Sequence, residues 1–334
     1  MGGLFELVHG YKSLSIIGMC KNAGKTTALN SLIRNYSGRA VLALTSIGRD
    51  GEKEDVISGA EKPAIFVRKG SIYATSEALL PLCEAESEII AMTGVSTALG
   101  DVVVLKAQGD GFVELAGPSM VSQLVDLSRL FYELGAQRIV IDGAMDRKSL
   151  CSRSLADATV LCAGAACGGS IEEVVADTTH ICGLLKTPEI ELMDAYITEP
   201  DVPALKYTFI GNSEASFPDG TDLALALKQT DTEPRSLFVE GAVTDSLIDN
   251  LLLSTLPEGF TIVARDASRL LLSASSLRKM SALQWQLRVR EGIRLAAVTV
   301  NPYTACGDCF DSKRFIDAMT KAVQVPVINV MDNE

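Results

Sequence analysis

The sequence predicts an α/β fold in which a largely parallel sheet is flanked by helices. Short apolar runs rich in β-branched residues recur between stretches with helical spacing, which is typical of strands buried on both faces. The chain has 334 residues, of which 47% are hydrophobic, so it exceeds an average single domain. A sizeable core is therefore expected, in one large sheet or in two unequal lobes.

The individual elements follow from local patterns. Ser119–Gly135 is expected to be a helix, because its apolar residues recur on one face and Gly135 suits a left-handed C-cap. Another helix should begin at Ser170, where Ser-Ile-Glu-Glu is a capping-box pattern, and two more at 244–254 and 312–323. The expected strands are 13–18, 40–47, 63–69, 101–107, 138–143, 158–163, 207–211, 236–240, 260–265, 295–300 and 326–330.

Charge and composition argue against several partners and locations. A formal net charge of −12 opposes binding to a nucleic-acid backbone or an anionic membrane, and the sequence shows no dense basic cluster. The N-terminal MGGLFELVHGYK has no export-signal pattern, so a cytoplasmic location is expected. Several of the eight scattered cysteines lie in apolar segments where reduced thiols pack, so a disulfide framework is not expected.

Residues 13–30, SLSIIGMCKNAGKTTALN, carry the most specific signal. A buried strand runs into a loop from Gly18 to Gly24, and Lys25 opens a helix. Backbone N–H groups of such a P-loop surround phosphate oxygens, a lysine neutralises the β/γ charge and a hydroxyl ligates Mg²⁺. An ordinary strand-to-helix turn is the alternative. We predict binding of ATP with Mg²⁺ by Gly18, Lys21, Asn22, Ala23, Gly24, Lys25, Thr26 and Thr27.

The spacing of this loop departs from the usual motif. Five residues rather than four separate Gly18 from Gly24. The longer loop resembles that of the dethiobiotin synthetase and cobyrinate amidase group, which implies a related P-loop NTPase.

Two acidic residues are candidates for the metal and for catalysis. Asp142 ends the apolar strand RIVIDGA and is predicted to bind Mg²⁺ together with Thr26, unless it is a solvated strand-end residue. The segment TSIGRDGE, 45–52, looks like a switch loop. In it, Asp50 would order the attacking water or lie near Mg²⁺, and Arg49 would face phosphate; a plain acidic turn is the alternative. Lys25 and Asp50 are thus the predicted catalytic residues.

Two further features lie near the C-terminus. Asn301 follows the strand LAAVTV and could contact a nucleobase edge, although Asn-Pro is also a common turn initiator. Cys306 and Cys309 form a CxxC pair that has no second pair or histidines beside it, so chance packing is the simpler interpretation.

A change of composition suggests the domain organisation. Around 189–235 the sequence becomes polar and rich in Pro and Asp. We expect a P-loop nucleotide-binding region at 1–190 and a C-terminal α/β region at 191–334, unless the two form one continuous domain.

Several segments together resemble one known family. GMCKNAGKTT, TSIGRDGE, VIDGAMDRKS, FVEGAVTDSL, VARDASRLLL and VTVNPYTACGDCFD are similar to the ATPase-type reactivase subunit of lysine 5,6-aminomutase. The resemblance implies two partners, a second reactivase subunit and a cobalamin-dependent aminomutase. It also implies that ATP turnover drives release of damaged cobalamin. Two alternatives stay open: an ATP-dependent carboxylate-activating ligase of the dethiobiotin synthetase type, and a nucleotide-gated metallochaperone using Cys306 and Cys309.

Overall fold

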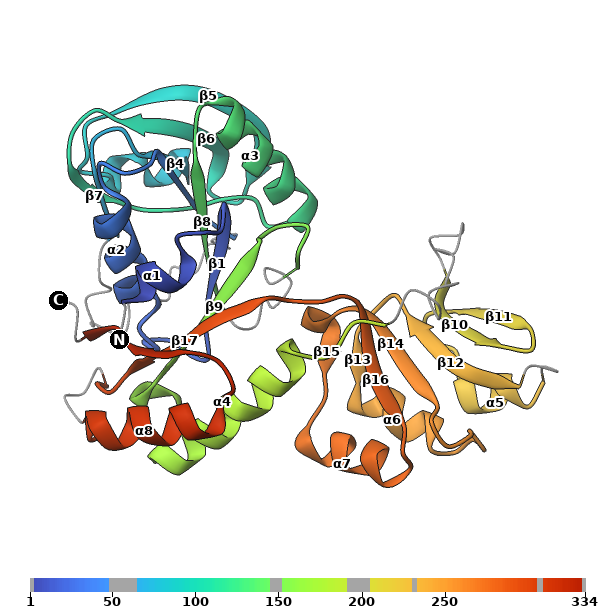
Figure 1. Ribbon diagram of the computed structural model, residues 1–334. Coiled ribbons are helices and arrows are strands. Elements are labelled where there is room, and N and C mark those ends of the chain that lie inside the picture. Colours follow the sequence, from blue (N-terminus) through green and yellow to red (C-terminus); the bar gives the residue numbers. More distant parts are fainter. Residues whose placement is uncertain are drawn as a thin grey trace. The chain divides into compact units, whose positions relative to one another are not determined.

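The chain forms two compact units. The computed structural model describes residues 3–47, 65–144, 152–190, 205–229, 233–304 and 309–331. Unit 1 comprises Met1–Thr179 and Arg294–Glu334, and unit 2 comprises His180–Ile293 (Figure 1). The expected division at residue 190 assigned the last forty or so residues to the second lobe. They belong instead to unit 1, because the strand Leu295–Asn301 pairs with Ala158–Gly164.

Unit 1 is built on a nine-stranded sheet with the order β18-β17-β9-β1-β8-β2-β4-β6-β5. Neighbours from β18 to β4 run parallel, whereas β6 is antiparallel to both β4 and β5. The expectation of a large, mostly parallel sheet flanked by helices is therefore confirmed. The strands are β1 (Ser13–Gly18), β2 (Leu42–Ser46), β4 (Ile72–Ser76), β5 (Ser87–Thr97), β6 (Gly100–Ala107), β8 (Arg138–Ala144), β9 (Ala158–Gly164), β17 (Leu295–Asn301) and β18 (Val327–Asn329).

The central strands form the core of unit 1. Every residue of β1 and of β9 is buried, as expected for parallel strands covered on both faces. Helix α2 (Lys25–Tyr36) contacts β1, and the described part of the unit has four further helices. These are α1 (Leu4–Val8), α3 (Val121–Glu133), α4 (Ile171–Leu185) and α8 (Ser312–Ala322), with short 3-10 turns η2 (Glu77–Leu82) and η4 (Ala165–Cys167).

The predicted capping at the start of α4 is largely reproduced. Ser170 Oγ accepts the backbone N–H of Glu173 at 3.1 Å, as expected, while Glu173 Oε2 accepts the N–H of Gly169, one residue before the cap, at 2.8 Å. Helices α4 and α8 lie side by side (Figure 1), and Arg314 of α8 pairs with Glu172 of α4. Helix α4 continues from unit 1 into unit 2.

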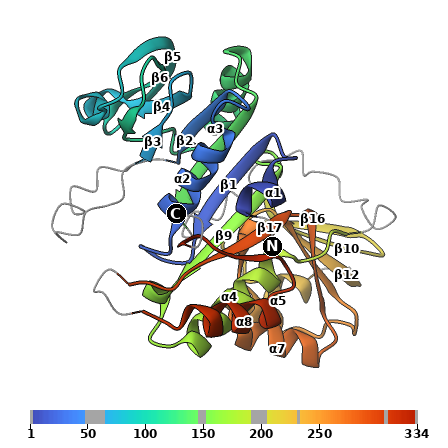
Figure 2. The same cartoon turned by 60° about the vertical axis from the view of Figure 1, so that its left-hand side comes forward.

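An antiparallel extension at one end of the sheet was not predicted. Strands β4, β5 and β6 lie together there, near the small pair of β3 (Ile65–Val67) and β7 (Gly111–Val113) (Figure 2). Ile89 and Met92 of β5 are exposed, because this strand is the outermost one of its sheet. No helix of the described ranges is long and apolar enough to cross a membrane.

Unit 2 has its own five-stranded sheet with the order β11-β10-β12-β14-β16. Strands β12, β14 and β16 run parallel, and β10 is antiparallel to β11 and β12. The strands are β10 (Leu205–Gly211), β11 (Glu214–Pro218), β12 (Pro234–Val239), β14 (Thr261–Asp266) and β16 (Gln286–Glu291), with the short pair β13 (Val243–Thr244) and β15 (Leu270–Leu271). The helices are α5 (Leu223–Leu227), α6 (Asp245–Leu251) and α7 (Ala274–Ala282), with η5 (Ala267–Arg269).

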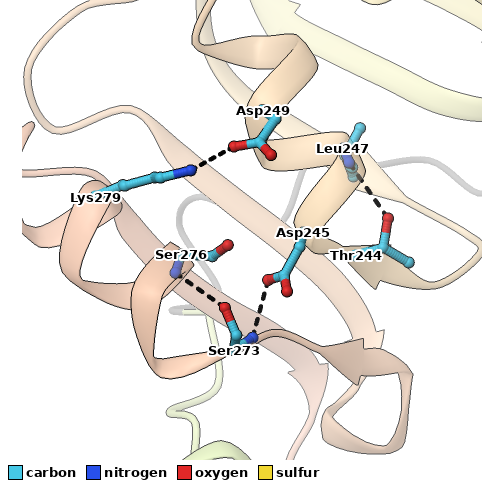
Figure 3. A network of polar contacts seen from close by, with 7 residues as sticks. All are labelled: Thr244, Asp245, Leu247, Asp249, Ser273, Ser276 and Lys279. Carbon is cyan, nitrogen blue, oxygen red and sulfur yellow. Dashed lines mark hydrogen bonds and ion pairs between the residues drawn. The ribbon is translucent and has the colours of Figure 1, made fainter.

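Helices α6 and α7 are joined through their N-terminal caps (Figure 3). Thr244 caps α6 and Ser273 caps α7, each accepting a backbone N–H three residues on. Asp245 Oδ1 accepts the N–H of Ser273 at 2.9 Å, and Lys279 pairs with Asp249 at 2.6 Å. Hydrogen bonds from Ser276 and Ser273 lower the pKa of the Asp245 carboxyl, so its ionised form is favoured in this network.

Candidate functional site

The glycine-rich loop 18–24 lies at the carboxyl end of β1 and leads directly into α2. Its backbone takes left-handed values at Asn22 (φ 62°) and Gly24 (φ 93°), two residue types that tolerate this region. Gly24 is the N-cap of α2 and provides no side-chain capping bond. The first N–H groups of the helix therefore point toward the loop without a side-chain acceptor from the cap residue, as at helix termini that bind anions.

The side chain of Lys25 folds back over the end of β1. A Cβ atom placed on Gly18 would lie 2.8 Å from Lys25 Cγ and 3.0 Å from Lys25 Nζ. Glycine at position 18 thus leaves the room that the lysine occupies. The ammonium group therefore lies over Gly18, at the start of the loop.

The sheet brings Asp142 to the same edge. In β8, Asp142 is level with Ile16 of β1 and with Ser46 of β2. The carboxyl ends of these parallel strands meet at one edge, which is where α/β sheets place ligands. Asp142 is half-buried, and its backbone carbonyl accepts the N–H of Ile47 at 3.1 Å.

The charges of Lys25 and Asp142 act on one shared neighbour. Cys162 of β9 is opposite Gly18, and its carbonyl accepts the N–H of Met19 at 2.8 Å. Burial raises the pKa of the Cys162 thiol to about 12; the charge of Lys25 opposes this rise and that of Asp142 adds to it. Both charged groups therefore lie close enough to act on the same buried atom.

Asn301 is also brought to the loop, but its amide is engaged there. Asn301 Nδ2 donates to the carbonyl of Asn22 at 3.3 Å, and Oδ1 accepts the N–H of Tyr303 at 3.1 Å. A Cβ on Gly24 would lie 3.0 Å from Asn301 Cβ. The side chain thus braces the loop from the end of β17, an arrangement that sequence reasoning did not anticipate.

The structure describes some of the remaining predicted site residues but not all of them. Ala23 is buried, Thr26 and Thr27 are half-buried in the first turn of α2, and Lys21 and Asn22 are exposed. Asp50 and Arg49 fall within 48–64, and Cys306 falls within 305–308; both ranges lie outside the described residues. Cys309 is exposed. Among the side chains that the structure describes, no three His, Cys, Asp or Glu gather as a metal site.

The loop carries a disulfide that the sequence analysis did not predict. Cys20, inside the loop, forms a disulfide with Cys167 at the end of η4, 147 residues later. Sequence spacing cannot reveal such a pair, because only the β1–β9 pairing makes the two loops neighbours.

Basic side chains gather at the opposite edge of the same sheet, where the sequence indicated no dense cluster. The parallel strands begin there, and two adjoining hollows share Lys12. The cations that line them are Lys12, Arg39, Arg138, Arg153 and Arg294. Each lies just before or at the start of a different strand or in a connection, so the cluster exists only in the folded chain.

The chain matches no protein-family model, no curated protein and no solved structure. Fold and site define its class as a mixed α/β protein with a glycine-rich strand–loop–helix segment at the carboxyl edge of a mostly parallel sheet.

Proposed function

We propose that unit 1 is a P-loop NTPase that binds ATP with Mg²⁺ at residues 18–27 and hydrolyses it. The observation that supports this best is the Lys25 side chain folded over Gly18, between a buried strand and a helix with a glycine N-cap. A plain strand-to-helix turn does not require glycine below a lysine. A phosphate site does, because the cation must reach the centre of the loop.

In this proposal each residue has a distinct task. Backbone N–H groups of the loop and of the start of α2 hold the phosphates, and Lys25 neutralises the β/γ charge. The Thr26 hydroxyl and the Asp142 carboxylate are the oxygen ligands that suit Mg²⁺. Bound Mg²⁺ would offset charge on the phosphate oxygens. Asp50 is proposed to orient the attacking water, from a segment that begins after Ile47.

The predicted contact of Asn301 with a nucleobase remains part of the proposal. Its Nδ2 and Oδ1 bond to Asn22 and Tyr303, and each atom keeps a second donor hydrogen or lone pair for a base edge. Asn301 would also stabilise the loop shape around Gly24.

The finer proposal is a reactivation factor. The chain-wide resemblance supports an ATPase that, with a second subunit, exchanges damaged cobalamin on an adenosylcobalamin-dependent lysine 5,6-aminomutase. The physical requirement is that the ATP and ADP states bind the mutase with different affinity, since otherwise hydrolysis could not drive the exchange. The assay incubates inactivated mutase with both subunits, fresh adenosylcobalamin, and ATP or a non-hydrolysable analogue. Mutase activity is expected to recover with ATP and not with the analogue. Full recovery without any nucleotide would refute an ATP-driven role.

The five-residue spacing between Gly18 and Gly24 favours one further candidate, an ATP-dependent carboxylate-activating ligase. Such an enzyme would turn over ATP only with its small acid substrate. A nucleotide-gated metallochaperone using Cys306 and Cys309 would instead bind metal stoichiometrically. No recovery of mutase activity under any condition would favour the ligase.

The nucleotide site itself is tested by calorimetry with ATP and Mg²⁺. Lys25→Ala should abolish detectable ATP binding. Among the described contacts of Gly18, Lys25 supplies the only cation, and the substitution removes it. Lys12→Ala is the matched control: it removes an exposed lysine at the other end of β1. Equal ATP affinity in Lys25→Ala and wild type would refute the site.

A further inference from the structure

The disulfide between Cys20 and Cys167 lies within the loop that is proposed to hold phosphate. Cys20 follows Gly18 by two residues, and Cys167 ends the turn that follows β9. Their Cα atoms are 5.4 Å apart, within the range of about 4.4–6.8 Å that a disulfide spans. The bond therefore requires no displacement of either backbone.

Three other thiols in the described chain, Cys83, Cys162 and Cys182, are poorly suited to oxidation, whereas Cys309 is exposed. Burial raises the pKa of Cys162 and of Cys182 to about 12 and also raises that of Cys83. Since the thiolate is the reactive form, these groups are protected. Cys20 and Cys167 are only half-buried and face each other, so among the described cysteines these two are placed to join on oxidation.

The bond adds to other attachments between the loop and β9. Met19 N–H donates to the carbonyl of Cys162, and a Cβ on Gly164 would lie 3.2 Å from Ala23 Cα. With the bond in place, the loop has its left-handed residues Asn22 and Gly24. Lys25 lies over Gly18 in the same structure. The bridged loop thus already has the shape that phosphate binding requires.

We propose that Cys20 and Cys167 form a reversible thiol–disulfide modification site that holds the phosphate-binding loop in its binding shape. The oxidant class is a peroxide. With hydrogen peroxide, the thiolate of one cysteine attacks one peroxide oxygen, the O–O bond breaks and a sulfenic acid forms; the leaving hydroxide takes up the proton that the thiol lost and departs as water. The second thiol then attacks that sulfur, the S–S bond forms and a second water leaves. Two electrons pass from the two thiols to the peroxide, and a dithiol reductant reverses the change.

This inference rests on the proposed nucleotide site. Oxidation should then strengthen ATP binding rather than weaken it. A reduced loop must be ordered when phosphate binds, which costs free energy for each residue that is fixed. The oxidised loop is ordered beforehand. We expect ATP to bind about five- to tenfold more tightly to the oxidised protein, the gain from pre-ordering roughly one loop residue.

The test compares wild type, Cys20→Ser, Cys167→Ser and the control Cys83→Ser, each treated with hydrogen peroxide or dithiothreitol. Peptide mapping without reductant should find the 20–167 link in wild type and Cys83→Ser only. In those two proteins, oxidation should tighten ATP binding and slow amide hydrogen exchange of residues 18–28 about tenfold. In the two loop variants neither quantity should respond to oxidant.

The outcomes separate the two proposals. Absence of the 20–167 link, or a link that leaves hydrogen exchange of the loop unchanged, would overturn the modification site. A link that slows exchange while ATP binds to neither state would support the modification site and refute the nucleotide-binding proposal.

Discussion

Gly18→Ala gives the sharpest separation between binding and stability. The new methyl group would lie 2.8 Å from Lys25 Cγ and 2.9 Å from Cδ, so the lysine must leave its place over the loop. Loss of a charge-assisted contact to phosphate costs about 1.5–3 kcal/mol, or about 10- to 150-fold in affinity. The fold should tolerate the change, because only a flexible side chain has to move. Replacing glycine by alanine in a strand stabilises the folded state by about 0.5–1 kcal/mol. This offsets a cost of similar size for moving the Lys25 side chain into another rotamer.

The assay is ATP titration with Mg²⁺ beside thermal unfolding of the same preparations. Gly10→Ala is the matched control, since nothing lies within 4 Å of a Cβ at that position. It should leave ATP affinity unchanged. Wild-type affinity in Gly18→Ala would refute the role of the Lys25 position, and a large fall in melting temperature would show that the glycine serves packing instead.

Three further predictions concern the metal ligand, the CxxC pair and unit 2. Asp142→Asn should lower Mg²⁺-dependent turnover more than Mg²⁺-free nucleotide binding, because it removes an anionic ligand; an equal fall in both would make Asp142 structural. Cys306→Ser with Cys309→Ser should leave ATP hydrolysis nearly unchanged, whereas stoichiometric zinc lost in this double variant would favour the metallochaperone. The lowered pKa of Asp245 contributes stability above its unfolded value near 4, and this is lost as pH falls through the lower folded value. Asp245→Asn should therefore flatten the decline of the free energy of unfolding by urea as pH falls below about 5, and an unchanged decline would contradict this.

The sequence predicted the strands and helices that local pattern determines. All six positions of β1 are buried, and Leu14, Ile16 and Ile17 ahead of a glycine-rich loop made the strand recognisable. The capping box at Ser170 and the glycines of the loop were likewise readable, because each depends on residues a few positions apart. The position of Asp142 at the level of β1 followed from the general rule for parallel sheets.

Features that depend on distant segments were missed. The return of β17 to unit 1 is decided by its pairing with β9, and nothing within LAAVTV signals that partner. Strand β5 was missed because its residues alternate between exposed and half-buried at the sheet edge and include Gly94. The Cys20–Cys167 bond and the gathering of Lys12 with Arg294 also arise only when the sheet assembles.

Amide hydrogen exchange with and without ATP and Mg²⁺ locates the ligand on the chain and so tests the proposed nucleotide site. ATP should protect residues 18–28, from Gly18 through the first turn of α2, and leave the start of β1 near Lys12 unchanged. Protection confined to the basic hollows around Lys12 and Arg294, with none in the glycine-rich loop, would contradict the proposed site.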